Sequence, residues 1–159
     1  MTNQKTSRAF TLIELLIVVA IIAVLAAIVF VSLDPLQRFQ EARNSSRWSD
    51  MNALINAIKV DQVDNGGSYL TAITDLTDDT AYMVGTGAGC NTGCTATTTQ
   101  AACADLTGLA TEGYIPSVPQ DPSTGVASST DYYIVRHASG AVTVGACDPE
   151  GGDTINIKQ

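Results

Sequence analysis

The sequence predicts an α+β fold in which one long N-terminal helix packs, through its distal half, on a small antiparallel β-sheet. Three observations support this prediction. Residues 10–33 form an apolar run, helical periodicity resumes beyond it to about residue 65, and short β-prone segments follow near the C-terminus. The chain has 159 residues, enough for one domain with a real core but hardly for two.

The apolar run is long enough to cross a membrane. Within residues 10–33 only Thr11, Glu14 and Ser32 are polar. At 1.5 Å per residue this run gives about 36 Å of helix, more than the roughly 30 Å of a bilayer's hydrocarbon core. Residues 1–9 are short, polar and basic, which predicts a leader that stays in the cytoplasm and directs the rest of the chain outward.

An ordinary secretory signal is the alternative for this end of the chain. The small residues from Ala23 to Ala27 offer a cleavage site, and cleavage after Ala27 would release a secreted protein. Such signals have a shorter apolar region, however, and Glu14 places a carboxylate near the start of this one.

Residues 34–65 are predicted to form the amphipathic half of the helix. Asp34-Pro35 predicts a kink or a new helix start, because proline lacks a backbone donor and clashes with the preceding turn. Apolar residues then recur at spacings of three and four, a stripe predicted to face a core: Trp48, Met51, Leu54, Ile55 and Ile58. The charged residues are predicted to lie mostly off this stripe: Arg43, Arg47, Asp50 and Lys59. Asp64-Asn65-Gly66-Gly67 then predicts the helix end.

Residues 66–159 are predicted to form an extracytoplasmic globular domain. Residues 66–125 are read as irregular, with a Cys-rich loop at 85–104. Residues 132–137 and 141–144, separated by a turn at Ser139-Gly140, predict a hairpin, and residues 154–157 predict a third strand.

The four cysteines, Cys90, Cys94, Cys103 and Cys147, all lie beyond the apolar run. An even number in an exported domain favours disulfides and an oxidising compartment. Three pairings are open. Zinc is the alternative, but the spacing does not match the tight pairs of zinc ribbons.

Composition excludes several functions. The formal net charge is -8 and becomes -10 (-8 minus 2) once Lys5 and Arg8 leave with the leader, which argues against nucleic acid as a partner. GxSxG, P-loop and HExxH patterns are absent from the sequence, and His137 is its only histidine, so we do not expect an enzyme.

Glu14 is the residue most informative about function. A charged group inside a membrane segment is costly, about 2.5–3.5 kcal/mol at the helix centre, although a residue near the helix start reaches the interface more easily. Cleavage between Ala9 and Phe10 would create an α-amine four residues before Glu14. A neighbouring copy that presents this amine would neutralise the carboxylate, so the costly group favours oligomers with a defined axial stagger.

These residues carry a family resemblance. Ser7-Arg8-Ala9 followed by the run from Phe10 to Ile22, FTLIELLIVVAII, resembles the prepilin signature of type IV pilins and type II secretion pseudopilins. The resemblance implies that a prepilin peptidase cuts before Phe10 and methylates the new amine, and that Glu14 supports docking of subunits in a filament.

The chain departs from the family's pattern at two places. The family usually has Gly before the cut where this chain has Ala9, which keeps the small size that cleavage needs. Pro35 lies a few residues beyond the position where many pilins carry a helix-melting proline. A weaker resemblance to major pseudopilins and small bacterial pilins extends over the helix end and residues 113–137, but not over the Cys-rich loop.

Calcium is the one cofactor considered. Some pseudopilins bind calcium in a distal loop, and Asp148, Glu150 and Asp153 are candidates for such a site. Their spacing is not that of an EF-hand loop, and solvated turn acids are the simpler interpretation, so no cofactor is expected.

The resemblance implies a structural filament subunit, anchored by a single pass in the bacterial cytoplasmic membrane and then part of a cell-surface or periplasmic filament. Its implied partners are copies of itself, the prepilin peptidase and methyltransferase, a pilus or secretion assembly platform, and the membrane. Two alternatives stay open: a pseudopilin of a type II secretion or DNA-uptake system, and a membrane-anchored extracellular binding module that uses the helix only as a tether.

Overall fold

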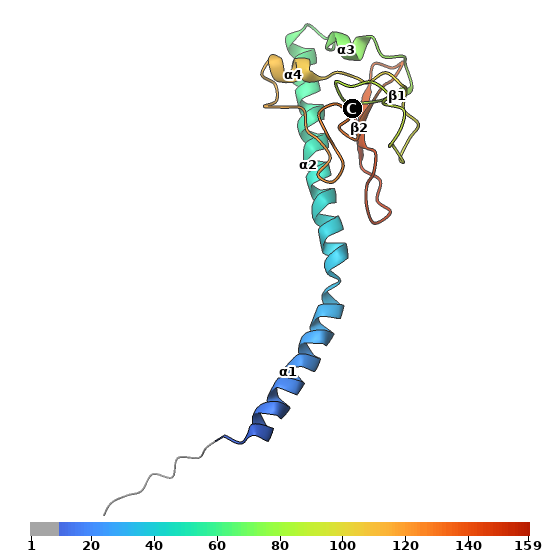
Figure 1. Ribbon diagram of the computed structural model, residues 1–159. Coiled ribbons are helices and arrows are strands. Elements are labelled where there is room, and N and C mark those ends of the chain that lie inside the picture. The colour runs from blue at the N-terminus through green and yellow to red at the C-terminus, as the bar shows by residue number, and fades with distance from the viewer. Residues whose placement is uncertain (1–9) are drawn as a thin grey trace, which may run out of the picture. The chain divides into compact units, whose positions relative to one another are not determined.

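The computed structural model describes residues 10–159 (Figure 1). The chain divides into two compact units, with the boundary between Arg38 and Phe39. The predicted leader, residues 1–9, lies outside the described residues. The first unit contains helix α1, Leu12–Leu33, and the start of α2, Pro35–Asp64. The second unit, Phe39–Gln159, is called the head below.

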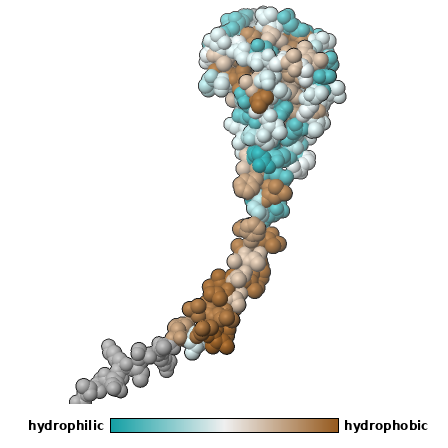
Figure 2. All heavy atoms as spheres, viewed as in Figure 1, coloured by the Kyte–Doolittle hydropathy of each residue, from teal (hydrophilic) through white to brown (hydrophobic). Residues whose placement is uncertain are grey.

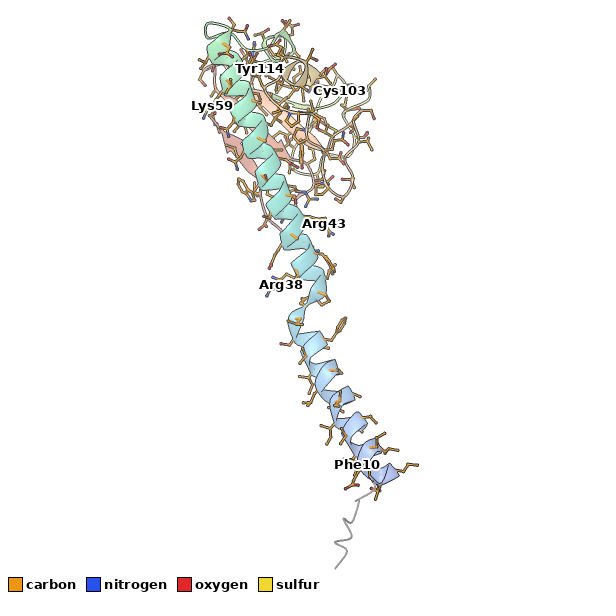
Figure 3. All side chains as sticks on the ribbon, turned by 90° about the vertical axis from the view of Figure 1, so that its left-hand side faces the viewer. Phe10, Arg38, Arg43, Lys59, Cys103 and Tyr114 are labelled. Carbon is orange, nitrogen blue, oxygen red and sulfur yellow. A yellow bond between two sulfur atoms is a disulfide. The ribbon has the colours of Figure 1, made fainter. Side chains whose placement is uncertain are left out.

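Helix α1 begins with a capping box. The Thr11 hydroxyl accepts a hydrogen bond from the Glu14 backbone N–H, and the Glu14 side chain accepts one from the Thr11 backbone N–H. These contacts satisfy donors that a helix start otherwise leaves unpaired. None of the residues Leu12–Leu33, all of which the structure describes, is buried. Figure 3 shows side chains projecting outward along this helix, and Figure 2 shows that they form a mostly hydrophobic surface, coloured brown.

The helix is interrupted at Asp34, as Asp34-Pro35 predicted. Asp34 takes a left-handed conformation, with φ 37° and ψ 73°, and α2 begins at Pro35. Proline suits the first helical position because its missing N–H would have no intrahelical partner there. The other end of α2 is closed by Gly66 and Gly67, both at positive φ, and the Gly67 N–H bonds to the Gln62 carbonyl.

The head contains a four-stranded antiparallel sheet in the order β1-β2-β3-β4. The strands are β1, Thr80–Met83; β2, Tyr132–Arg136; β3, Val142–Ala146; and β4, Asn156–Lys158. Two short helices, α3, Thr71–Thr74, and α4, Thr107–Thr111, lie in the connections. The predicted α+β fold, with a long N-terminal helical segment and a small antiparallel sheet, is confirmed.

The main core lies between α2 and one face of the sheet. From α2 it takes Met51, Leu54, Ile55 and Ile58, as the apolar stripe predicted, and from the sheet it takes Tyr132, Ile134, Val142 and Val144. Trp48 was wrongly placed in this stripe, because 41% of it is exposed. Instead, the neighbouring residue Arg47, one helical turn before Met51, has a fully buried side chain.

Residues 66–125 are more regular than predicted, since they contain β1, α3 and α4. Strand β1 is only four residues long, and the β2 residues with which it pairs lie 50 to 56 positions further along the chain, so local periodicity gives little indication of it. The C-terminal strands also begin later than predicted, at Val142 rather than 141 and at Asn156 rather than 154.

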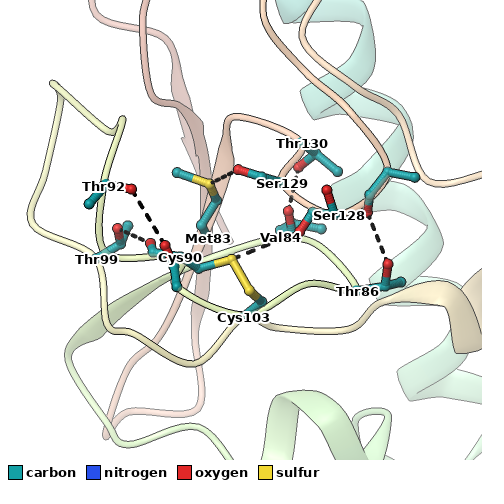
Figure 4. The surroundings of a disulfide bond; sticks show 12 residues. Met83, Val84, Thr86, Cys90, Thr92, Thr99, Cys103, Ser128, Ser129 and Thr130 are labelled. Carbon is teal, nitrogen blue, oxygen red and sulfur yellow. Dashed lines mark hydrogen bonds between the residues drawn. A yellow bond between two sulfur atoms is a disulfide. The ribbon is translucent and has the colours of Figure 1, made fainter.

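The other face of the sheet is covered by the Cys-rich loop. Two disulfides join Cys90 to Cys103 and Cys94 to Cys147, which selects one of the three pairings left open by the sequence. Ala81, Met83 and Tyr133 pack beneath them in a second, smaller core. Around the first disulfide the Thr99 hydroxyl donates to the Cys90 carbonyl, and the Thr86 hydroxyl donates to the Ala127 carbonyl (Figure 4).

Candidate functional site

The start of α1 brings together the described residues that the sequence singled out for processing and assembly. Phe10 is 80% exposed and precedes the helix. The Thr11 N–H and hydroxyl both bond to Glu14 Oε2, at 3.0 and 2.8 Å. The other carboxylate oxygen, Oε1, receives neither of these bonds. Ala9, the residue on the other side of the predicted cut, lies outside the described residues.

The rest of α1 offers an apolar surface on all sides. Its large aliphatic residues from Ile13 to Leu33 are between 50% and 80% exposed, with Val18 and Val31 at the two limits. A soluble monomer rarely exposes so large an apolar surface, which marks a contact with lipid or with other proteins. By length and composition, the helical segment from Leu12 also contains a stretch that could cross a membrane.

The head contains a network of polar side chains, centred on Arg47 of α2. Its guanidinium is fully buried and donates twice to Asp121, from Nε at 2.5 Å and from Nη2 at 3.1 Å. Further bonds run to Asn44 Oδ1 at 2.8 Å, Glu150 Oε2 at 3.0 Å and Ser123 Oγ at 3.1 Å. A buried charge needs this degree of pairing because desolvation is costly.

The electrostatics of this group favour ionised acids. Burial alone would raise the pKa of Asp121, but hydrogen bonds from Arg47 and Ser123 outweigh burial and lower it to about 2. Hydrogen bonds from Arg43 and Arg47 lower the pKa of Glu150 to about 2 as well. Asp50 of α2 behaves in the opposite way: burial raises its pKa, although the Tyr132 hydroxyl donates to it at 2.6 Å.

The calcium candidates lie beside this group. Arg43 donates to both oxygens of Glu150, and the Asn44 amide donates to Asp153 Oδ2 at 2.7 Å. Two of the three candidate acids therefore serve as partners of α2. The residues described contain no cluster of three or more His, Cys, Asp or Glu side chains suited to a metal ion.

His137 follows β2, where it has two polar neighbours. Its Nδ1 lies 2.7 Å from Asp79 Oδ1 and its Nε2 lies 2.8 Å from Thr143 Oγ1. No local pattern predicts the contact with Asp79, which is 58 positions away in the chain. The contacts tie the turn before β1 to the β2–β3 hairpin.

Sequence reasoning missed the buried role of Arg47 and its partner Asp121. The one available signal was spacing, because Arg47 lies four residues before Met51 and seven before Leu54 and so belongs to the buried stripe. Asp121 is 74 positions from Arg47, and no local pattern connects them.

Comparison with known proteins identifies the N-terminal part of the chain. Residues 4–30 match the family described as the prokaryotic N-terminal methylation motif. The chain therefore carries a prepilin signature like that of type IV pilins and pseudopilins, as the resemblance indicated. No curated protein and no solved structure matches the chain.

Proposed function

We propose that this chain, which carries a type IV pilin-like prepilin signature, is a structural subunit of a type IV pilus-like filament. Prepilin peptidase would cut between Ala9 and Phe10 and methylate the new amine. The observation that carries the proposal is the coincidence of the methylation motif with a helix whose apolar side chains are all exposed. Lipid would cover these side chains before assembly, and helices of other copies would cover them afterwards.

The proposal assigns a role to each region. Residues 1–9 are the leader, residues 10–33 the membrane and assembly helix, residues 34–65 the amphipathic helix, and residues 66–159 the exported domain. The chain would sit in the bacterial cytoplasmic membrane with its head outside, until an assembly platform adds it to a filament. The two disulfides support export, since they form in oxidising compartments.

Glu14 would give the filament its stagger. Its Oε2 is occupied by Thr11 of the same chain, so we assign Oε1 to the amine of a neighbouring copy's Phe10. Opposite charges attract strongly where water is excluded, and an unpaired carboxylate there is unfavourable. Bundling is therefore favoured in the register that pairs every Glu14.

Intact mass and N-terminal peptide mapping of the chain from its host membrane test the processing step. We expect a chain that begins at N-methylated Phe10. A chain that begins at Met1 would instead support a tethered module, and one that begins after Ala27 would show a secretory signal.

A matched pair of variants tests assembly separately. In Glu14→Gln we expect the yield of sheared surface filament to fall by at least about tenfold, while the processed membrane pool persists, because a neutral amide cannot form an ion pair with the charged amine. Glu112→Gln makes the same chemical change at an exposed position of the head and should assemble normally. Equal filament yields from the two variants would contradict the role of Glu14.

A further inference from the structure

A polar hollow lies on the disulfide-bearing side of the head. Its volume is about 300 Å³, and its lining comes from the Cys-rich loop, from β2 and β3, and from the segment that ends in β4. The polar groups in the lining are Thr95, Tyr133, Asp153, Thr154 and Asn156. Small-molecule sites begin at about this size, roughly 300 Å³.

The sheet register builds the floor of this hollow. Tyr133, Gly145 and Asn156 are partners in one row across β2, β3 and β4. Gly145 leaves the room that the Tyr133 ring fills, because a Cβ at this position would lie 2.4 Å from the ring. Asn156 lies beside Gly145 in this row and lines the hollow together with Tyr133.

The rim is held in place before any ligand arrives. The disulfide from Cys94 to Cys147 fixes the adjoining loop. The Cys147 carbonyl accepts two further bonds, from the Thr95 hydroxyl at 3.0 Å and from the Ala96 N–H at 2.9 Å. A fixed rim lowers the conformational entropy that binding would cost.

The charge of the lining selects the class of ligand. Among the described residues of the lining, none is Lys, Arg or His, so the hollow offers no cation to an anionic group. Asp153 is its one acid, and the Asn44 amide already donates to Oδ2 of that carboxylate, which leaves too few ligands for a metal ion. The adjoining loop, residues 85–104, contains no charged residue in a chain of net charge -8.

The remaining chemistry is mixed. Hydroxyl, amide and carboxylate groups alternate with the apolar surfaces of Ala96, Pro149 and Ile155 and with an aromatic ring. A sugar ring presents the matching combination, with hydroxyls around its edge and C–H groups on its faces. We propose that this hollow binds one ring of a neutral carbohydrate. The site does not depend on filament assembly and would be present in a single copy.

The test uses the full-length chain in micelles of a detergent without a sugar headgroup, since an alkyl glycoside would compete for the site. The probes are immobilised neutral hexoses and N-acetylhexosamines, with their disaccharides, beside sialylated and sulfated glycans. Thr154→Trp fills the hollow from an exposed position, and Asn156→Ala removes an amide without adding bulk. Thr98→Trp is the matched control, exposed on the same loop but outside the lining.

We expect binding to at least one neutral sugar, a loss of at least about tenfold in Thr154→Trp and Asn156→Ala, and no change in Thr98→Trp. Three results would overturn the proposal: no neutral probe bound at about 10 mM, binding of charged glycans alone, or equal binding by Thr154→Trp and the control.

Discussion

The replacement of Arg47 by methionine is the sharpest test of how the head is held together. Methionine keeps much of the length and the helix propensity of arginine but removes the charge and every donor. Arg47 and Asp121 both have fully buried side chains, and Arg47 makes five hydrogen bonds to four residues. The variant leaves the Asp121 carboxylate buried with only the neutral donors of its own turn.

Breaking a buried ion pair from one side typically costs about 3–5 kcal/mol, because the remaining charge is uncompensated. We expect a loss of this size in the free energy of unfolding of the head. Urea titration of the detergent-solubilised chain, with its disulfides intact, measures the loss through the fluorescence of Trp48, the only tryptophan.

Two further variants separate the charge effect from a general effect of substitution. Lys59→Met removes an exposed cation from the same helix and should change the free energy of unfolding by less than about 0.5 kcal/mol. Arg47→Met combined with Asp121→Asn leaves no buried charge at that contact and should recover at least about 1 kcal/mol. A loss below about 1 kcal/mol in Arg47→Met, or a double variant weaker than the single one, would refute the reasoning.

Three more predictions concern the head, and urea midpoints check each. The pKa of Asp121 is about 2 in the folded state against an ordinary 3.8. The contribution of this carboxylate to stability is therefore present above about pH 4 and is lost as the pH falls towards 2. A urea midpoint that stays constant from pH 5 to pH 2.5 would contradict this. Gly145→Ala forces a Cβ to within 2.4 Å of the Tyr133 ring and should cost about 1–3 kcal/mol, whereas an unchanged midpoint would show that the ring moves freely. Replacement of both Cys94 and Cys147 by serine opens a loop of 53 residues. It should lower the free energy of unfolding by about 4 kcal/mol, because the unfolded chain gains conformational entropy, and an unchanged midpoint would contradict this reasoning.

Local sequence patterns were enough for the elements that depend on local physics. The apolar run, the break at Asp34-Pro35 and the helix end at Gly66-Gly67 follow from composition and backbone preference, and all appear where expected. The hairpin of β2 and β3 follows from two runs rich in aromatic and β-branched residues that are separated by a glycine turn. In each case the residues that decide the structure lie within a few positions of it.

Contacts between distant residues were not predictable in the same way. Strand β1 exists because it pairs with β2, and the cysteine pairing depends on how the Cys-rich loop folds over the sheet. The partners of Arg47 are a further example, since Asp121 and Glu150 lie 74 and 103 positions away. A pattern within one segment contains no information on which remote segment will cover it.

Two residues of α2, Arg47 and Trp48, were assigned to the wrong face for a more specific reason, which is that residue type was given more weight than spacing. Arg47, Met51, Leu54, Ile58 and Asp61 follow one another at alternating steps of four and three, and all five are fully buried. The buried stripe therefore begins and ends with a charged residue, each bonded to a loop of the head: Arg47 to the 121–125 turn, and Asp61 to the Leu70 N–H. An apolar residue at either end would pack but would leave the loop's polar groups without a partner, which costs about 1–3 kcal/mol for each group. The charged ends thus determine where the loops attach to α2, and the apolar residues between them supply the burial.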